Sequence, residues 1–142
     1  MIYLAGSCAQ EHRKMMETIA NFLRINNEEI YCPFEFQINN AYDYSQEEWA
    51  RCIFEADKAA IDKADIFLMI SPGRIGSAGT NWEQGYAYAK NKKVIVIQYT
   101  NEPTSLMTFC GCDIFINTSC LDDILLVIHE NRSQEKCPTI LT

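Results

Sequence analysis

The sequence predicts an α/β protein built on a five-stranded parallel sheet with helices on both faces. Short, wholly apolar segments alternate along the chain with longer segments in which apolar residues recur at helical spacing. Strands that are buried on both faces lack the alternation of apolar and polar residues seen in half-exposed strands. The length of 142 residues suits one domain spanning 1–142.

The expected strands are the short apolar segments, most of which end at a turn-forming residue such as Gly, Ser, Pro or Asn. A parallel sheet needs a crossover between successive strands, and a helical segment follows most of them. The five expected strands are Ile2–Ala5, Ile30–Cys32, Ile66–Ile70, Val94–Gln98 and Asp113–Asn117.

Local signals mark where the helices begin. Ser45 followed by Glu48 is a capping box, in which each residue satisfies a free backbone N–H of the other. Thr80 or Asn81 is expected to cap the helix after the third strand. Residues 34–44 are expected to form a loop, and the tail to Thr142 shows no period. The expected helices are Gln10–Arg24, 46–63, Trp82–Lys90, a single turn at Ser105–Phe109, and Leu121–His129.

Composition excludes several classes of function. The formal net charge is −7 and no basic cluster occurs, so binding to a nucleic-acid polymer is not expected. No apolar run approaches the ~18 residues of a membrane span. The N-terminal segment lacks the basic region of a signal peptide. We therefore expect a cytoplasmic protein without a membrane partner.

The cysteine content favours a reducing compartment. Seven cysteines are an odd number, and we expect free, mostly buried thiols rather than a disulfide framework. Cys110 and Cys112 form a C-x-C pair, but no second Cys or His pair follows at zinc-site spacing. No metal and no cofactor are expected. The cysteines are Cys8, Cys32, Cys52, Cys110, Cys112, Cys120 and Cys137.

Ligands of open parallel sheets bind beyond the carboxyl ends of the strands. Two segments lie there: Gly6–Cys8 after the first strand and Ser71–Thr80 after the third. The second is rich in glycine and leads into a helix, a combination that lets backbone N–H groups approach an anion. The alternative is an ordinary strand-to-helix connection.

Two carboxylates and one tyrosine are the candidate reactive groups. Glu83 is expected in the first turn of the helix after this loop. The alternative to a reactive role is that its carboxylate only stabilises the positive end of the helix dipole. Gly85 inside the same helix predicts close packing there or the close approach of something large. Asp57 shares a helical stripe with apolar residues, where burying a carboxylate is costly. We therefore expect it to be paired with another group, to take part in the function, or to lie at the exposed edge of the stripe. Tyr3, in a buried strand, needs a partner for its hydroxyl, for which a facing carboxylate is suitable.

Several of these residues fall into one recognisable pattern. The pattern comprises Ile-Tyr-Leu-Ala-Gly-Ser at 2–7, Pro33-Phe34, Trp49 with Asp57 eight residues on, Ala64-Asp65, and the segment from Ser77 to Ala87. Over roughly residues 1–117 the chain resembles the nucleoside 2-deoxyribosyltransferase family. The resemblance implies a flavodoxin-like three-layer sandwich and cleavage of an N-glycosidic bond.

The resemblance also implies roles for individual residues. Glu83 would attack the anomeric carbon of 2-deoxyribose, as in a retaining glycosidase. Tyr3 would hold Glu83 in place. Asp57 would face the nucleobase and protonate it, with a pKa raised beside Trp49. Phe34 and Gly79 belong to the same motifs and are expected to contact the substrate.

The chain departs from the transferases at two positions. Ser77 stands where they carry an aspartate, and Ser105 where they carry an asparagine contributed by a neighbouring subunit. The family's 2'-deoxynucleoside 5'-phosphate N-hydrolases have serines at both positions, which bind the 5'-phosphate. A serine hydroxyl can donate to a phosphate that a carboxylate would repel. The loop after the first strand is shorter here, so Ser7 and Arg13 would supply the remaining contacts.

We therefore expect an enzyme that cleaves 2'-deoxynucleoside 5'-monophosphates through a deoxyribosyl-glutamate intermediate. One alternative is a transferase that exchanges bases between free deoxynucleosides. Another is a nucleotide-binding protein without turnover. The resemblance further implies a homodimer or larger homo-oligomer with shared sites. Base preference does not follow from the sequence.

Overall fold

The structure, a computed structural model, describes residues 1–132. Its five strands are all parallel and lie in the order β2-β1-β3-β4-β5. This order is that of flavodoxin-like sheets and confirms the predicted fold class. The part of the expected tail at 133–142 lies outside the described residues. The strands are β1 (Ile2–Ala5), β2 (Ile30–Tyr31), β3 (Ile66–Ser71), β4 (Lys93–Gln98) and β5 (Ile114–Asn117).

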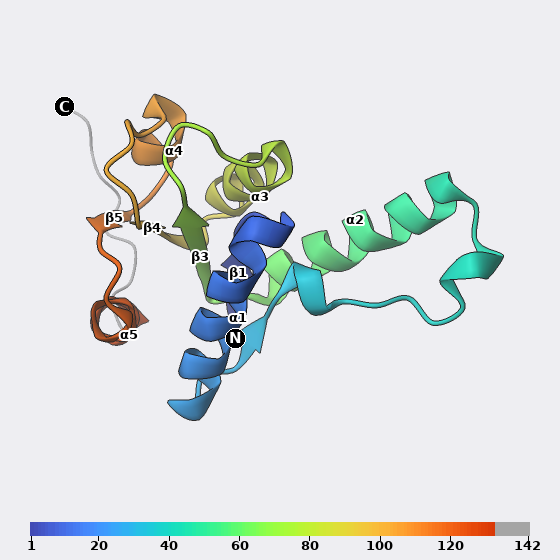
Figure 1. Ribbon diagram of the computed structural model, residues 1–142, viewed down its shortest axis with the longest axis horizontal. Helices are drawn as coiled ribbons and strands as arrows, with labels where there is room; N and C mark the ends of the chain where they lie inside the picture. The colour runs from blue at the N-terminus through green and yellow to red at the C-terminus, as the bar shows by residue number, and fades with distance from the viewer. Residues whose placement is uncertain (133–142) are drawn as a thin grey trace.

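Helices cover the sheet on both sides (Figure 1). The segment expected as a loop, 34–44, contains most of two short 3₁₀ turns, Pro33–Glu35 and Ala41–Asp43. Helices α1 and α5 pack on one face, and α2 and α3 on the other. The α-helices are α1 (Gln10–Ile25), α2 (Gln46–Lys63), α3 (Ala78–Ala89), α4 (Leu106–Cys110) and α5 (Leu121–Arg132).

The period of two along each strand decides which side chains can reach the functional face. In β1, Ile2 and Leu4 enter the core beneath α1 and α5, whereas Tyr3 and Ala5 enter the core beneath α2 and α3. All four side chains are fully buried. Tyr3 is therefore held rigidly under the two helices that carry Asp57 and Glu83.

Helix α2 begins as predicted but is packed differently. The Ser45 hydroxyl accepts a hydrogen bond from the Glu48 N–H at 3.2 Å, and the Glu48 carboxylate accepts one from the Ser45 N–H at 2.8 Å. Among its 18 residues only Ala60 and Ile61 are buried. The expectation that an apolar stripe of this helix is buried is wrong at the N-terminal end of the helix, where Trp49 is 44% exposed. That end extends away from the sheet in Figure 1.

Helix α3 begins one turn earlier than expected. Ser77, rather than Thr80 or Asn81, is its N-cap, and its hydroxyl accepts a hydrogen bond from the Thr80 N–H at 3.4 Å. Because of this cap the glycine-containing sequence after Ser77 continues as helix instead of loop. Glu83 consequently lies in the second turn of α3, and its expected position in the first turn is wrong.

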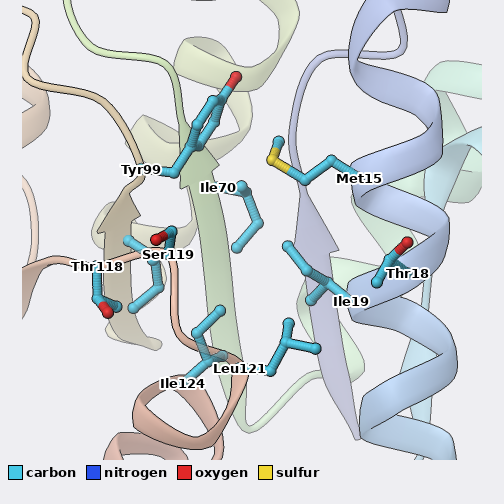
Figure 2. A pocket seen from close by; sticks show the side chains of 10 residues that line it. Met15, Thr18, Ile19, Ile70, Tyr99, Thr118, Ser119, Leu121 and Ile124 are labelled. Carbon is cyan, nitrogen blue, oxygen red and sulfur yellow. The ribbon is translucent and has the colours of Figure 1, made fainter.

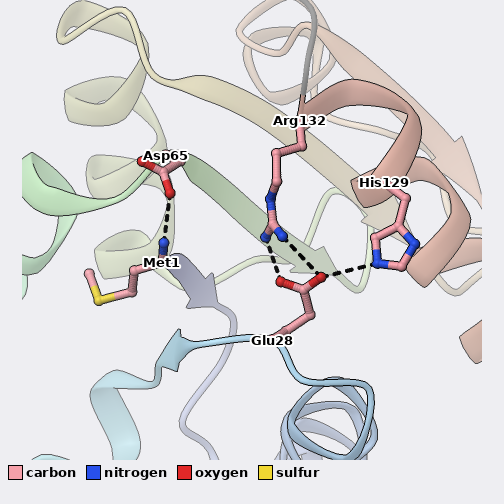
Figure 3. A network of polar contacts seen from close by, with 5 residues as sticks. All are labelled: Met1, Glu28, Asp65, His129 and Arg132. Carbon is pink, nitrogen blue, oxygen red and sulfur yellow. Dashed lines mark hydrogen bonds and ion pairs between the residues drawn. The ribbon is translucent and has the colours of Figure 1, made fainter.

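The C-terminal end of α5 is tied to the turn between α1 and β2 (Figure 3). Both terminal nitrogens of Arg132 donate to the buried Glu28 carboxylate, and His129 Nε2 lies 3.1 Å from it. Burial opposes ionisation of Glu28, but its partners hold the pKa of this carboxyl below the usual value. Nearby, the Met1 amine pairs with Asp65 at 2.6 Å.

The cysteines of the described part of the chain are all free, but they are not mostly buried. Only Cys32 is buried, whereas Cys8, Cys110 and Cys120 are exposed. The expectation of burial is wrong because these three lie in loops or at helix ends rather than inside strands. Cys137 lies outside the described residues.

A cavity of about 360 Å³, lined mainly by apolar side chains, opens between α1 and α5 (Figure 2). It lies on the face of the sheet opposite Asp57 and Glu83. Within the described range, none of the helices combines the length and the apolar character needed to span a bilayer.

Candidate active site

A small cavity brings the two predicted carboxylates together. Asp57 from α2 and Glu83 from α3 line the same space of about 190 Å³. Gly79, one turn before Glu83 on α3, lines it as well. The other lining residues are Phe54 and Trp82, both of them aromatic. Two acids beside an aromatic wall give the cavity acid–base groups and a surface for a flat ligand.

A row of aromatic rings supports this cavity from the sheet. Tyr31, Tyr3 and Phe67 occupy paired positions on the neighbouring strands β2, β1 and β3. The Tyr3 ring stacks on each neighbour with centroids 5.4 Å apart. Stacked rings on a rigid sheet fix the direction of both tyrosine hydroxyls. Each hydroxyl then faces one carboxylate of the cavity.

Tyr31 is the partner of Asp57. Its hydroxyl donates to Asp57 Oδ1 at 2.8 Å. Burial raises the pKa of Asp57, and the hydrogen bond from Tyr31 opposes that rise because it stabilises the ionised form. Sequence reasoning missed Tyr31. Its pairing with Tyr3 across the sheet depends on register, for which a two-residue strand gives no local signal.

Glu83 is the more strongly perturbed carboxyl. Burial, and then the charge of Asp57, raise its pKa to about 7, and the Tyr3 hydroxyl opposes this rise. The Tyr3 hydroxyl is buried and forms no hydrogen bond of normal geometry to any residue of 1–132. It is therefore directed toward Glu83 without being fully bonded to it. Because the charge of Asp57 acts on Glu83, the two carboxyls titrate as a coupled pair.

The loop after β1 lies beside this pair. Burial, followed by the charges of Glu83 and Asp57, raises the pKa of the Cys8 thiol, whereas the charge of Arg13 lowers it. Cys8 is therefore near enough to both carboxylates and to Arg13 to be affected by their charges. Next to it, the Ser7 hydroxyl accepts a hydrogen bond from the Ala9 N–H at 3.3 Å. A hydroxyl that accepts in this way still has its own proton to donate.

Arg13 is held at the edge of this loop by two neighbours. Its Nε donates to Glu17 at 3.1 Å, and its guanidinium carbon lies 5.9 Å above the Phe34 ring. The side chain is half-exposed and keeps further N–H groups for a ligand. Phe34 therefore contacts Arg13 and the core beneath α1, and does not line the Asp57–Glu83 cavity.

Two other predicted site residues lie away from the cavity. Trp49 is eight residues from Asp57 on α2, about 12 Å along the helix axis, so it does not shield that carboxyl. Ser105 lines a separate cavity of about 530 Å³ together with Gly85. A Cβ added at Gly85 would meet no atom within 4 Å, so the expectation of close packing there is wrong within this chain.

No metal centre is apparent in the described part of the chain. Residues 1–132 contain no group of three or more His, Cys, Asp or Glu side chains that could hold an ion. The groups that face the cavity are two coupled carboxyls and two tyrosine hydroxyls.

With two coupled, half-buried carboxyls at the carboxyl end of a flavodoxin-like sheet, the chain is an α/β protein with an acid–base site. The model of the nucleoside 2-deoxyribosyltransferase family matches residues 2–131, and the chain belongs to this family of enzymes. The resemblance of its motifs to that family is thereby confirmed.

Solved structures show the same relationship. The chain is 28% identical to a 2-deoxyribosyltransferase from Bacillus psychrosaccharolyticus, with a TM-score of 0.76 over 87% of this chain and 88% of that one. It shares its fold with a CMP N-glycosidase from Clostridium botulinum (21% identity, TM-score 0.58, 90% and 97% covered). It also shares its fold with a 2-deoxyribosyltransferase from Leishmania mexicana, with 20% identity and a TM-score of 0.65 over 92% of this chain and 97% of that one. A search of curated protein sequences finds no significant match.

Proposed function

We propose that the protein hydrolyses the N-glycosidic bond of 2'-deoxynucleoside 5'-monophosphates. The observation that carries this proposal is the pairing of Glu83 and Asp57 in one small cavity, each faced by a tyrosine hydroxyl from the sheet. Such a pair can divide the work of nucleophile and proton donor, because the ionisation of one favours protonation of the other.

The reaction proceeds in two steps. The Glu83 carboxylate attacks C1' of the sugar, the C1'–N bond breaks, and its electron pair leaves with the base. When Glu83 is ionised, the proton of the coupled pair lies on Asp57, and Asp57 gives it to that base. Water then attacks C1' of the deoxyribosyl ester, Asp57 takes a proton from the water, and Glu83 leaves as a carboxylate. The products are the free base and 2-deoxyribose 5-phosphate, with retained configuration at C1'.

Tyr3 and Tyr31 act on the carboxylates and not on the sugar. The Tyr3 hydroxyl can donate to Glu83 when this residue is ionised, which keeps one carboxylate oxygen aimed at C1'. Tyr31 occupies Asp57 Oδ1, so Oδ2 is left free for the base. Both are positioning residues held by the stacked rings of β1 and β2.

The 5'-phosphate is assigned to the residues around the starts of α1 and α3. The Ser77 and Ser7 hydroxyls each accept one backbone N–H and each retain a proton for a phosphate oxygen. The start of α3 adds the positive end of a helix dipole. Arg13 adds a full positive charge near Cys8. No carboxylate stands at position 77 to repel the dianion.

Assembly into a homo-oligomer is part of this proposal. Ser105 is separated from the Glu83 cavity of its own chain but lies beside the open surface at Gly85. Exposed apolar side chains surround it, namely Tyr88, Leu106 and Met107. A second copy that packs on this surface would cover these side chains and bring its Ser105 toward the neighbouring site.

One observation favours a second candidate function. The relative from Bacillus psychrosaccharolyticus, at 28% identity, is a 2-deoxyribosyltransferase. In that case a second nucleobase, rather than water, would take the sugar from Glu83. The glycine-poor loop after β1, which offers few phosphate donors, agrees with this alternative.

Release of free base tests the proposal. The protein is incubated with dAMP, dGMP, dCMP and dTMP, and separately with free deoxynucleosides with and without an acceptor base. Base released from the monophosphates supports hydrolysis. Exchange only on free nucleosides supports the transferase, and binding without turnover contradicts both. Glu55→Ala, an exposed carboxylate two residues from Asp57 that does not line the cavity, is the matched control for Glu83→Ala.

A further inference from the structure

Two buried glutamines hold the segment between β4 and β5 and have no role in the chemistry described so far. Gln98, the last residue of β4, is 1% exposed, and Gln84, which follows Glu83 on α3, is 4% exposed. A side-chain amide is costly to bury unless its polar atoms are bonded. The partners of both amides lie in the same connecting segment.

Gln98 binds the turn that follows β4. Its Nε2 donates to the carbonyl oxygens of Thr100 at 3.1 Å and Glu102 at 2.6 Å, and its Oε1 accepts from the Thr104 hydroxyl at 2.7 Å. Both N–H groups and the oxygen of the amide are thereby used. The turn that leads to Ser105 is therefore fixed to the end of a buried strand.

Gln84 binds the other end of the segment, at α4. Its Nε2 donates to the carbonyl oxygens of Thr108 at 2.8 Å and Gly111 at 3.0 Å. A Cβ added at Gly111 would lie 3.3 Å from Gln84 Nε2, so a larger residue there would crowd this contact. Helix α4 is consequently attached to the helix that carries Glu83.

Ser105 lies between these two attachments, and its hydroxyl is not used to cap α4. It occupies the N-cap position, where a serine usually accepts a backbone N–H, but its side chain forms no capping hydrogen bond. It lines the cavity of about 530 Å³ beside Gly85 instead, on the surface that we assign to a second copy. Because α4 has only five residues, its own hydrogen bonds stabilise it weakly. The two glutamines supply the missing support.

Resting on the proposed function, we propose that Gln84 and Gln98 are positioning residues that fix Ser105 for the active site of a neighbouring copy. Gln98 fixes the turn before Ser105, and Gln84 fixes the helix after it. Both act on the substrate's 5'-phosphate through the Ser105 hydroxyl. Since Gln84 adjoins Glu83 on α3, the segment that a chain lends to its neighbour is attached to the helix of its own active site.

Affinity for dGMP tests the positioning role without turnover. In the Glu83→Gln background, Ser105→Ala should weaken dGMP binding by about ten- to hundredfold, the effect of one hydrogen bond to a charged group. Gln98→Met and Gln84→Met keep the length of the side chain and remove its donors. Each should weaken dGMP binding by about fivefold or more, but by no more than Ser105→Ala does. Binding of deoxyguanosine, which has no phosphate, should be unchanged.

A double-variant cycle shows whether the glutamines act through Ser105. Added to Ser105→Ala, Gln98→Met should cause no further loss of dGMP affinity, whereas a general loss of structure would add to it. Asn131→Ala, which removes an amide-to-carbonyl hydrogen bond within α5, is the matched control and should bind dGMP as its parent does. Equal dGMP affinities of Gln98→Met and this control would overturn the positioning role.

Hybrid dimers test the assignment to a neighbouring site. A Glu83→Ala chain and a Gln98→Met chain, carrying different affinity tags, are purified together. The intact Glu83 of the second chain then receives Ser105 from the first chain, whose glutamines are intact. Hydrolysis of dGMP should return to about half the wild-type rate, because one of the two sites is complete. A hybrid no faster than the Gln98→Met homodimer would show that Gln98 acts within its own chain.

The outcomes separate this inference from the proposed function. If the wild type releases base from dGMP but both glutamine variants bind dGMP normally, the positioning role is wrong and the hydrolase stands. If the variants lose affinity through Ser105 but the wild type never releases base, the positioning role stands and the proposed reaction is wrong. A wild type that stays monomeric at micromolar concentration would overturn the assignment to a neighbouring site.

Discussion

Glu83→Gln should stabilise the protein at alkaline pH while abolishing its turnover. Burial and the charge of Asp57 raise the pKa of Glu83 from 4.5 to about 7. Ionisation of Glu83 therefore costs more in the folded chain than in the unfolded chain. At about 1.4 kcal/mol for each pKa unit, this difference amounts to about 3 kcal/mol.

The sign of the pH dependence follows from the raised pKa. The stability contributed by protonated Glu83 is fully present below about pH 4.5 and is lost as the pH rises through about 7. Glutamine has nearly the same shape and never ionises. The free-energy gain of Glu83→Gln should therefore grow from near zero at about pH 4.5 to about 3 kcal/mol above about pH 8.

Urea unfolding of both proteins across this pH range measures the difference. Glu55→Gln, which removes an exposed carboxylate outside the cavity, controls for the loss of one negative charge. Asp57→Asn provides a second check, because it removes the neighbouring charge that raises the pKa of Glu83 and should shrink the effect of a subsequent Glu83→Gln. A free-energy difference between Glu83→Gln and wild type that is constant with pH would refute the account of Glu83 as a buried, coupled carboxyl.

Three further predictions concern positioning, phosphate binding and assembly. Tyr31→Phe removes the hydrogen bond that favours ionised Asp57, so the alkaline limb of the pH profile of kcat/KM should move to higher pH; an unchanged profile would contradict this role. Ser77→Asp preserves a good N-cap for α3 but adds a negative charge, so kcat/KM for dGMP should fall by about 1.5–3 kcal/mol and that for deoxyguanosine by less. A wild-type ratio of the two values at or below one would favour the transferase. Light scattering should show at least a dimer at micromolar concentration, and a fully active monomer would exclude a shared site at Ser105.

The sheet could be predicted from sequence because parallel strands buried on both faces appear as uninterrupted apolar segments. The placement of Tyr3 near the carboxylates also follows, since the period of two sends it to one face of β1. Asp57 was singled out because a carboxylate on an apolar stripe is costly unless it is paired or used, and Glu83 because it follows a glycine-containing loop on the ligand side of the sheet.

Other parts of the site depend on contacts that no local pattern encodes. Tyr31 meets Asp57 only through the register of a two-residue strand. Phe54 replaces Trp49 at the cavity because α2 contacts the sheet only near its C-terminal end, which spacing along the helix does not show. The predicted start of α3 was too late because a glycine soon after Ser77 is typical of a loop, although Ser77 caps the helix there.

The central claim, that Glu83 carries the sugar as a covalent ester, is most directly tested by mass spectrometry of the protein quenched in acid during turnover of a deoxynucleoside monophosphate. The account predicts a peptide bearing 2-deoxyribose 5-phosphate on Glu83, absent from the Glu83→Ala variant, whose turnover should fall at least about a thousandfold. Release of base without any adduct on Glu83, together with activity retained in Glu83→Ala, would contradict it.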